Sequence, residues 1–65
     1  MKIIVNGASH ETVAVELAAV LEELGFREAV VTTAVNGEFV AAGFRDRMRL
    51  ADGDRIEVLA PMQGG

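Results

Sequence analysis

Apolar and polar residues alternate along this chain in short segments, each closed by a turn signal. The first apolar run, residues 3–5, stops at Asn6-Gly7. Asn-Gly favours a two-residue β-hairpin turn because both residues tolerate a positive φ. A second short strand is therefore expected around residues 8–11.

The next segment has helical periodicity. Thr12 can act as the N-cap, because its hydroxyl can accept a hydrogen bond from the first turn. Apolar residues with spacings of four, three, one and three lie on one predicted helix face: Val13, Leu17, Val20, Leu21 and Leu24. Gly25 fits the C′ position that ends a helix, and Phe26 is placed for the apolar contact that often follows. An amphipathic helix of about three turns is expected.

The following residues predict a second hairpin. Residues 29–35 are rich in Val and Thr, which favour strands. Another Asn-Gly pair, Asn36-Gly37, turns the chain into a strand over residues 38–41. Gly43 interrupts this pattern, and residues 44–50 are expected to be irregular, with room for one helical turn.

The last predicted strand follows a turn at Asp52-Gly53-Asp54. Residues 55–58 alternate between polar and apolar side chains, so this strand is expected to be half-buried. Pro61 has no N–H to donate to a strand ladder and marks where the ladder ends.

The order strand, strand, helix, strand, strand, strand predicts an α+β fold. One helix would cover one face of a five-stranded mixed sheet. If the first and last strands lie side by side at its centre, the fold is the β-grasp, or ubiquitin-like, roll. The strand residues expected to face the helix are Ile3, Val5, Ile56 and Val58. Residues 1–60 would form this domain, and residues 61–65 a flexible C-terminal tail that leaves the central strand.

Composition limits the class of function. The 65 residues carry a net charge of -4, which argues against a nucleic-acid partner because such partners need a basic surface. The chain has no cysteine, which excludes disulfides, thiolate metal sites and a cysteine nucleophile. No apolar run approaches the roughly 20 residues that span a bilayer, and residues 1–5 are too short for a signal peptide. A soluble, cytoplasmic domain without membrane association is expected.

The side chains indicate no conventional active site. His10 is the only histidine, has no second metal ligand beside it, and is expected on the solvated surface. Ser9 would point to the opposite face of an extended segment, which argues against a nucleophile–base pair with His10. Asp52 and Asp54 supply too few oxygens for a calcium site and are expected to form a turn. We therefore expect no catalytic residue, no metal and no bound cofactor.

Two groups of residues could dock a partner. Arg45, Arg47 and Arg49 are spaced by two, so in an extended segment they would share a face that binds a phosphate or an acidic partner. The alternative is a solvated loop balanced by neighbouring acidic residues. Ile4 and Leu59 are both expected to point away from the helix and to form a small exposed apolar patch beside the tail. The alternative for these two residues is ordinary scattered surface exposure.

The tail offers backbone chemistry instead. Gly64 and Gly65 have no Cβ, so such a tail can thread a narrow channel and adopt unusual dihedral angles. Its terminal carboxylate is a poor electrophile until one oxygen becomes a leaving group, for example in an acyl-adenylate made from ATP. The catalysis would then belong to partner enzymes, and this chain would be their substrate.

These residues resemble the ThiS family, the small sulfur-carrier proteins of thiamin biosynthesis. The resemblance is carried by residues 3–7, 12–25, 35–38 and 50–58 and by the terminal Gly-Gly. The family implies a β-grasp fold and an adenylating partner of the ubiquitin-activating type that uses ATP and magnesium. It also implies a sulfur donor such as a cysteine desulfurase, and a thiazole synthase that receives the sulfur.

By position, the resemblance makes Gly65 the residue that becomes a thiocarboxylate and Gly64 its required neighbour. Pro61, Met62 and Gln63 would enter the partner active sites with them. One departure is Ala41-Ala42, where many relatives have a Pro-Arg pair, and it concerns docking rather than the tail.

Three alternatives remain open on the sequence. The small subunit of molybdopterin synthase shares the fold, the Asp-Gly-Asp turn and the tail. A ubiquitin-like protein modifier would instead pass the activated Gly65 carbonyl to a lysine. A plain interaction module would keep its binding when Gly65 is deleted, whereas a carrier would be disabled.

Overall fold

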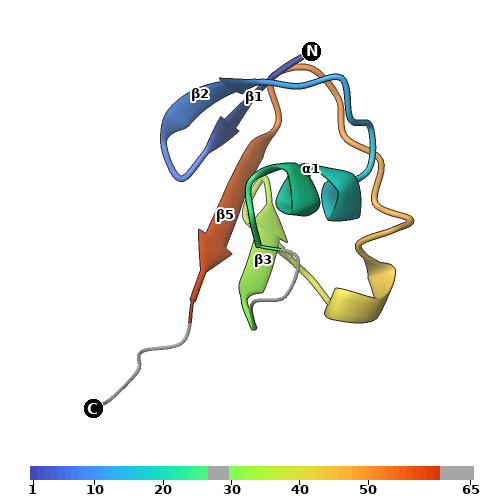
Figure 1. The fold of residues 1–65 in the computed structure, drawn as a ribbon. Coiled ribbons are helices and arrows are strands. Elements are labelled where there is room, and N and C mark those ends of the chain that lie inside the picture. Colours follow the sequence, from blue (N-terminus) through green and yellow to red (C-terminus); the bar gives the residue numbers. More distant parts are fainter. Residues whose placement is uncertain (27–29, 61–65) are drawn as a thin grey trace.

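The structure, a computed structural model, describes residues 1–26 and 30–60. Its elements in chain order are β1 (Lys2–Val5), β2 (Ala8–Glu11), α1 (Leu17–Glu23), β3 (Thr32–Val35), β4 (Glu38–Val40), the 3₁₀ helix η1 (Ala42–Phe44) and β5 (Arg55–Leu59). The strands form one sheet in the order β2-β1-β5-β3-β4, and α1 lies across one face of it (Figure 1). β1 and β5 run parallel at the centre, and the remaining neighbours pair antiparallel. The predicted β-grasp arrangement is confirmed.

The core lies between the helix and the central strands. Of the four strand residues predicted to face the helix, Ile3, Ile56 and Val58 are buried and Val5 is half-buried against them. From α1, the buried side chains are Leu17, Val20 and Leu21. These are the apolar positions predicted from the helical spacing, so sequence periodicity located this part of the core.

Both Asn-Gly pairs form the predicted turns. Asn6 and Gly7 have φ values of 49° and 85°, and Asn36 and Gly37 have 51° and 87°. Positive φ at both central residues is what a type I′ hairpin requires. The turns therefore fix the β1–β2 and β3–β4 pairings locally.

The start of the helix was predicted wrongly. α1 begins at Leu17, and Thr12 does not cap it. The Thr12 hydroxyl instead accepts a hydrogen bond from the N–H of Ala14 at 3.0 Å. Val13 is 94% exposed and does not belong to the apolar stripe.

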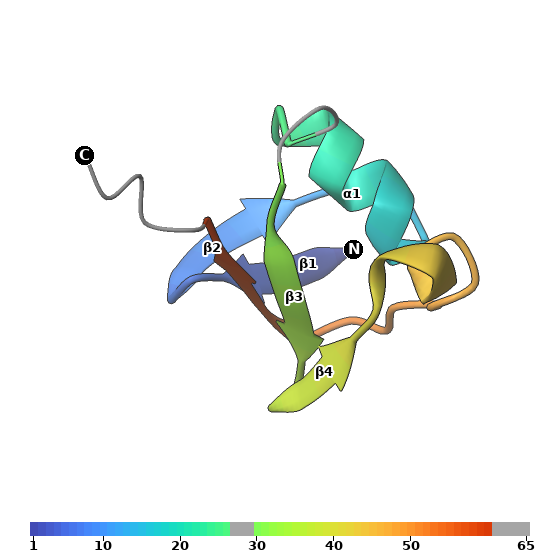
Figure 2. The same ribbon diagram turned by 90° about the horizontal axis from the view of Figure 1, so that it is seen from below.

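A distant loop takes the place of the expected side-chain cap. The N–H of Leu17 donates to the carbonyl of Met48 at 2.9 Å, and that of Ala18 donates to the carbonyl of Arg45 at 3.0 Å. Helix N-termini need such partners because their first N–H groups have none within the helix. Figure 2 shows the loop after η1 lying beside the start of α1.

The predicted end of the helix is confirmed. Gly25 has a φ of 92°, and its N–H donates to the Glu22 carbonyl at 3.1 Å. The N–H of Phe26 donates to the Leu21 carbonyl at 2.8 Å, which completes a Schellman motif. The Phe26 side chain packs against the core as expected.

The remaining boundaries differ by a few residues. β3 begins at Thr32 rather than at residue 29, which itself lies outside the described residues. β4 ends at Val40, and the one helical turn is η1, which begins two residues before the segment predicted to be irregular. Within residues 1–26 and 30–60, no helix is long and apolar enough to cross a membrane.

Candidate functional site

The predicted reactive tail follows the central strand β5 in the sequence. Its residues Pro61, Met62, Gln63, Gly64 and Gly65 lie outside the described residues. The described part of the candidate site is therefore β5 itself, the groups that fix it, and the sheet face beside it.

Asn6 fixes the C-terminal half of β5. Its side-chain Nδ2 donates to the Val58 carbonyl at 3.1 Å, and the Val58 N–H donates to its Oδ1 at 2.8 Å. β1 ends at Val5, so the Asn6 amide continues the ladder where the neighbouring strand has stopped. Two backbone groups of β5 that face β1 are satisfied in this way.

The other hairpin asparagine fixes the start of β5. The Arg55 N–H donates to Asn36 Oδ1 at 3.0 Å, and Asn36 Nδ2 donates to Asp54 Oδ1 at 3.0 Å. The second Asp54 oxygen accepts from the N–H of Ala51 at 2.8 Å. Asp54 thus acts in the turn that precedes β5.

Asp52 also has a structural role, because its Oδ1 accepts a hydrogen bond from the Lys2 N–H at 2.7 Å. Both aspartates are turn formers, as predicted. Among the described residues, no group of three or more His, Cys, Asp or Glu side chains could hold a metal ion.

The face of the sheet opposite α1 is the face on which Ile4 and Leu59 were predicted to form an apolar patch. Along β5, Arg55, Glu57 and Leu59 are exposed and alternate with buried residues. Leu59 is 65% exposed, and the half-buried Ile4 pairs with Arg55. Ile4 and Leu59 therefore share a face, but about 13 Å of strand length separates their register positions. They do not adjoin as the sequence analysis expected.

Phe39 belongs to this face and was not selected from the sequence. It is 70% exposed, and it pairs with Ala34, which in turn pairs with Glu57. The alternation in β4, where the next residue Val40 is buried, was the available signal. We name this surface the outer sheet face; it comprises Ile4, Ala34, Phe39, Arg55, Glu57 and Leu59.

The three arginines do not form one surface, because their segment is a turn rather than extended. Arg45 points inward: its Nε donates to Thr33 Oγ1 at 3.0 Å and its Nη2 to the Val31 carbonyl at 2.6 Å. Arg47 is exposed, and the Arg49 guanidinium lies 3.9 Å from the Glu16 carboxylate. Of the two alternatives left open by the sequence, the shared arginine face is therefore not formed.

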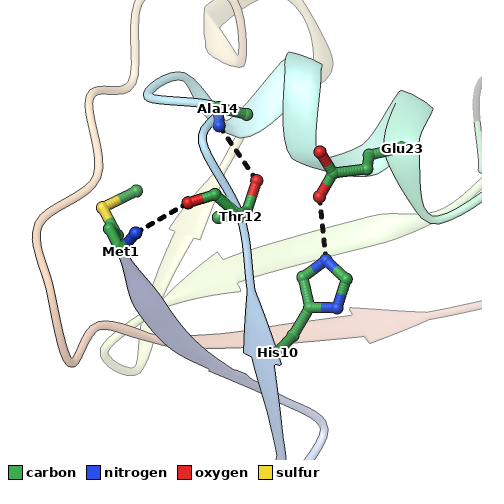
Figure 3. A network of polar contacts seen from close by, with 5 residues as sticks. All are labelled: Met1, His10, Thr12, Ala14 and Glu23. Atoms are coloured by element: carbon green, nitrogen blue, oxygen red, sulfur yellow. Dashed lines mark hydrogen bonds and ion pairs between the residues drawn. The ribbon is translucent and has the colours of Figure 1, made fainter.

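His10 is more constrained than a solvated surface residue. Its Nε2 lies 2.8 Å from Glu23 Oε1, so the ring links β2 to α1 (Figure 3). The hydrogen bond from His10, with a smaller one from Thr12, lowers the pKa of the Glu23 carboxyl below its ordinary value of 4.5. The backbone carbonyl of Thr12 also accepts from the N-terminal amine at 2.8 Å. The His10–Glu23 contact ties β2 to α1, and the Met1–Thr12 contact joins the start of β1 to the residue after β2, so both serve structure.

Comparisons with known proteins agree with this geometry. The model of the ThiS family matches residues 3–65. The crystal structure of the thiamine biosynthesis protein ThiS from Geobacter metallireducens is 30% identical, with a TM-score of 0.84 and full coverage of both chains. An NMR solution structure of a thiamine biosynthesis protein from the same organism is 29% identical, with a TM-score of 0.79, all of this chain covered and 88% of the other. A search of the curated proteins found no significant match.

Proposed function

The chain belongs to the ThiS family, and on this premise we propose that it carries sulfur for thiamine biosynthesis as a thiocarboxylate on Gly65. The observation that carries the proposal is the extent of the family match, which runs from residue 3 through Gly65. The two similar structures are those of thiamine biosynthesis proteins, which supports the choice of pathway.

The proposed cycle begins with activation by an adenylating partner of the ubiquitin-activating type. A Gly65 carboxylate oxygen attacks the α-phosphorus of ATP, pyrophosphate leaves, and magnesium on the partner balances the phosphate charge. The acyl-adenylate carbonyl is then an electrophile, because AMP is a good leaving group.

Sulfur transfer follows from a persulfide on a donor such as a cysteine desulfurase. The terminal sulfur attacks the Gly65 carbonyl carbon and AMP leaves. A thiol then reduces the remaining S–S bond, which leaves the thiocarboxylate. Thiazole synthase accepts this sulfur for the thiazole ring. In this proposal the chain is a co-substrate, the catalysis belongs to its partners, and it binds no cofactor of its own.

The residues of the chain contribute shape and docking. Gly64 and Gly65 suit a narrow active-site channel because they lack a Cβ, and residues 61–63 would enter with them. The outer sheet face is the proposed docking surface. Leu59 exposes apolar area on β5, the strand that leads to the tail, and Phe39 exposes apolar area on the same face of the sheet. The surface differs from the arginine loop considered from the sequence, where Arg45 is engaged internally.

The test is the intact mass of the protein purified from thiamine-starved cells that contain its activating enzyme. We expect a mass increase equal to the exchange of one oxygen for one sulfur, and no such increase in a Gly65 deletion. An unmodified mass in the presence of the active enzyme would contradict the proposal.

The same material separates the alternatives. A protein modifier would give an isopeptide adduct between Gly65 and a lysine of another protein. A molybdopterin carrier would form the thiocarboxylate but would not support thiazole formation when mixed with thiazole synthase.

A further inference from the structure

We propose that Asn6 is a positioning residue that aims the C-terminal carboxylate into the activating partner's site. This inference rests on the proposed function, because it concerns where Gly65 is delivered. Asn6 lies in the first hairpin turn, far from the tail in sequence.

The edge of β5 that faces β1 is hydrogen-bonded to the β1 segment as far as Ile56. The Ile4 N–H donates to the Asp54 carbonyl and the Asn6 N–H to the Ile56 carbonyl, both at 2.9 Å. Alternate residues of a strand present their backbone groups to the same edge, so Val58 is the next residue of β5 on this edge. No β1 residue lies opposite Val58, because β1 ends at Val5 and the chain turns at Asn6 and Gly7.

The Asn6 side chain provides the pairing that a further strand residue would have made. It binds both the N–H and the carbonyl of Val58, as a backbone partner would. On the opposite edge, β3 pairs with β5 as far as Leu59, through Thr32. With Asn6 in place, β5 is bonded on both edges close to its end. Without Asn6, the last residues of β5 would be bonded on one edge only.

A loss of constraint at Val58 would change the direction in which β5 ends, and with it the place from which residues 61–65 start toward the partner's site. Errors of about 1 Å in the placement of reacting groups can cost about 100-fold in rate. The direction in which β5 ends should therefore affect the rate of activation.

Asn36 provides a matched control within the same chain. It too precedes a glycine, has a positive φ of 51°, and binds a backbone N–H of β5 through its side chain. Its partner is Arg55, the first residue of β5, so it acts at the end of the strand far from the tail. Replacing either asparagine by glycine keeps the turn, because glycine accepts positive φ.

The experiment compares Asn6→Gly, Asn36→Gly and the unaltered protein as substrates of the purified activating enzyme, with pyrophosphate release as the readout. We expect Asn6→Gly to lower kcat by about tenfold, since the carboxylate is misplaced more often. The KM of Asn6→Gly should stay within about twofold of that of the unaltered protein, because the outer sheet face is intact and still binds the activating enzyme. Asn36→Gly should leave kcat within about twofold, although it loses side-chain hydrogen bonds of the same kind.

A second variant guards against a folding defect in the first. Asn6→Asp retains the acceptor for the Val58 N–H and loses the donor to the Val58 carbonyl, and should lower kcat in the same direction. Urea unfolding verifies that the variants are folded at the assay temperature. Amide hydrogen exchange should accelerate at Val58 in Asn6→Gly and at Arg55 in Asn36→Gly.

The outcomes separate this inference from the function on which it rests. If the unaltered protein is adenylated and the Asn6 variants keep its kcat, the positioning role is overturned and the carrier function stands. A change confined to KM would also overturn it, because that would indicate docking. If the unaltered protein is not adenylated by an active enzyme, the carrier function itself is wrong. A fall in kcat specific to the Asn6 variants supports the proposal.

Discussion

At the scale of single residues, Arg45 and Arg47 show how differently two neighbouring cations can be used. The Arg45 guanidinium binds the hydroxyl of Thr33, which is fully buried and itself donates to the Val40 carbonyl at 2.9 Å. Arg47 is exposed in the same turn. The first arginine therefore joins the loop after η1 to β3, whereas the second is on the surface.

This difference predicts unequal losses of stability. Arg45→Ala removes two charge-assisted hydrogen bonds and should lower the free energy of unfolding by about 2 kcal/mol. Arg47→Ala, as the control, should change it by no more than about 0.5 kcal/mol. The urea midpoint at constant m-value measures both. Equal effects of the two variants would mean that the inward contacts of Arg45 contribute little.

Leu59 belongs to the residue scale as well, as the exposed apolar residue of β5. Leu59→Glu should weaken binding to the activating enzyme by about tenfold or more, because a charge would be buried without a partner in an apolar interface. The fold should be unaffected, since the side chain is 65% exposed in the free protein. Isothermal titration measures the affinity. Val13→Glu makes the same charge change at an exposed valine outside the outer sheet face, and should leave the affinity unchanged.

At the scale of elements, α1 shows where local sequence signals fail. Its C-terminus was predictable, because Gly25 and Phe26 stop the helix through contacts within the last turn. Its N-terminus was not, because the carbonyls of Arg45 and Met48 accept the first N–H groups from a distant loop. Thr12 is a residue type that often caps helices, but its hydroxyl accepts a hydrogen bond within a turn before the helix. A cap from another part of the chain leaves no signal beside the helix.

The contact between β2 and α1 should make stability depend on pH. The Glu23 pKa in the folded protein is lowered, first by the hydrogen bond from His10. A lowered folded-state pKa means that the contribution is complete above the ordinary value of 4.5 and is lost as the pH falls through the folded-state value. Stability should therefore decline with acid below about pH 4.5.

The measurement is the urea midpoint between pH 3 and pH 7. Glu23→Gln should flatten the acid limb of this curve, and His10→Gln should flatten it less, because the Thr12 hydrogen bond that also lowers the Glu23 pKa remains. The double variant should behave like Glu23→Gln, because removal of the carboxylate already removes the contact with His10. Additive effects would show that His10 and Glu23 act separately.

At the scale of the whole molecule, the sequence was most informative where structure depends on near neighbours. Strand alternation, helical spacing and two Asn-Gly turns placed Ile3, Leu17 and Ile56 in the core. The features that the sequence did not reveal depend on contacts between segments that are far apart in the chain. Asn6 and Val58 are 52 residues apart, so the bonds that pair them are invisible to any local pattern. The register of β1 on β5, which separates Ile4 from Leu59, is likewise set by tertiary pairing.

The division between domain and tail leads to a final prediction for the whole molecule. The buried core of the described residues runs from Ile3 to Val58, and the pairing of β5 extends to Leu59. A chain truncated after Ala60 should therefore keep its free energy of unfolding, measured by urea denaturation, to within about 0.5 kcal/mol. It should also retain the outer sheet face while lacking the carboxylate that reacts.

Such a chain should act as a competitive inhibitor of the activation of the full-length protein. If docking rests on the outer sheet face, its inhibition constant should lie near the KM of the full-length substrate, as pyrophosphate release can measure. The truncated chain with Leu59→Glu is the control and should not inhibit. Absence of inhibition by the folded, truncated chain would place most of the binding energy in residues 61–65. The domain would then deliver the tail without contributing much affinity, and Asn6 would matter for delivery while Leu59 would not matter for binding.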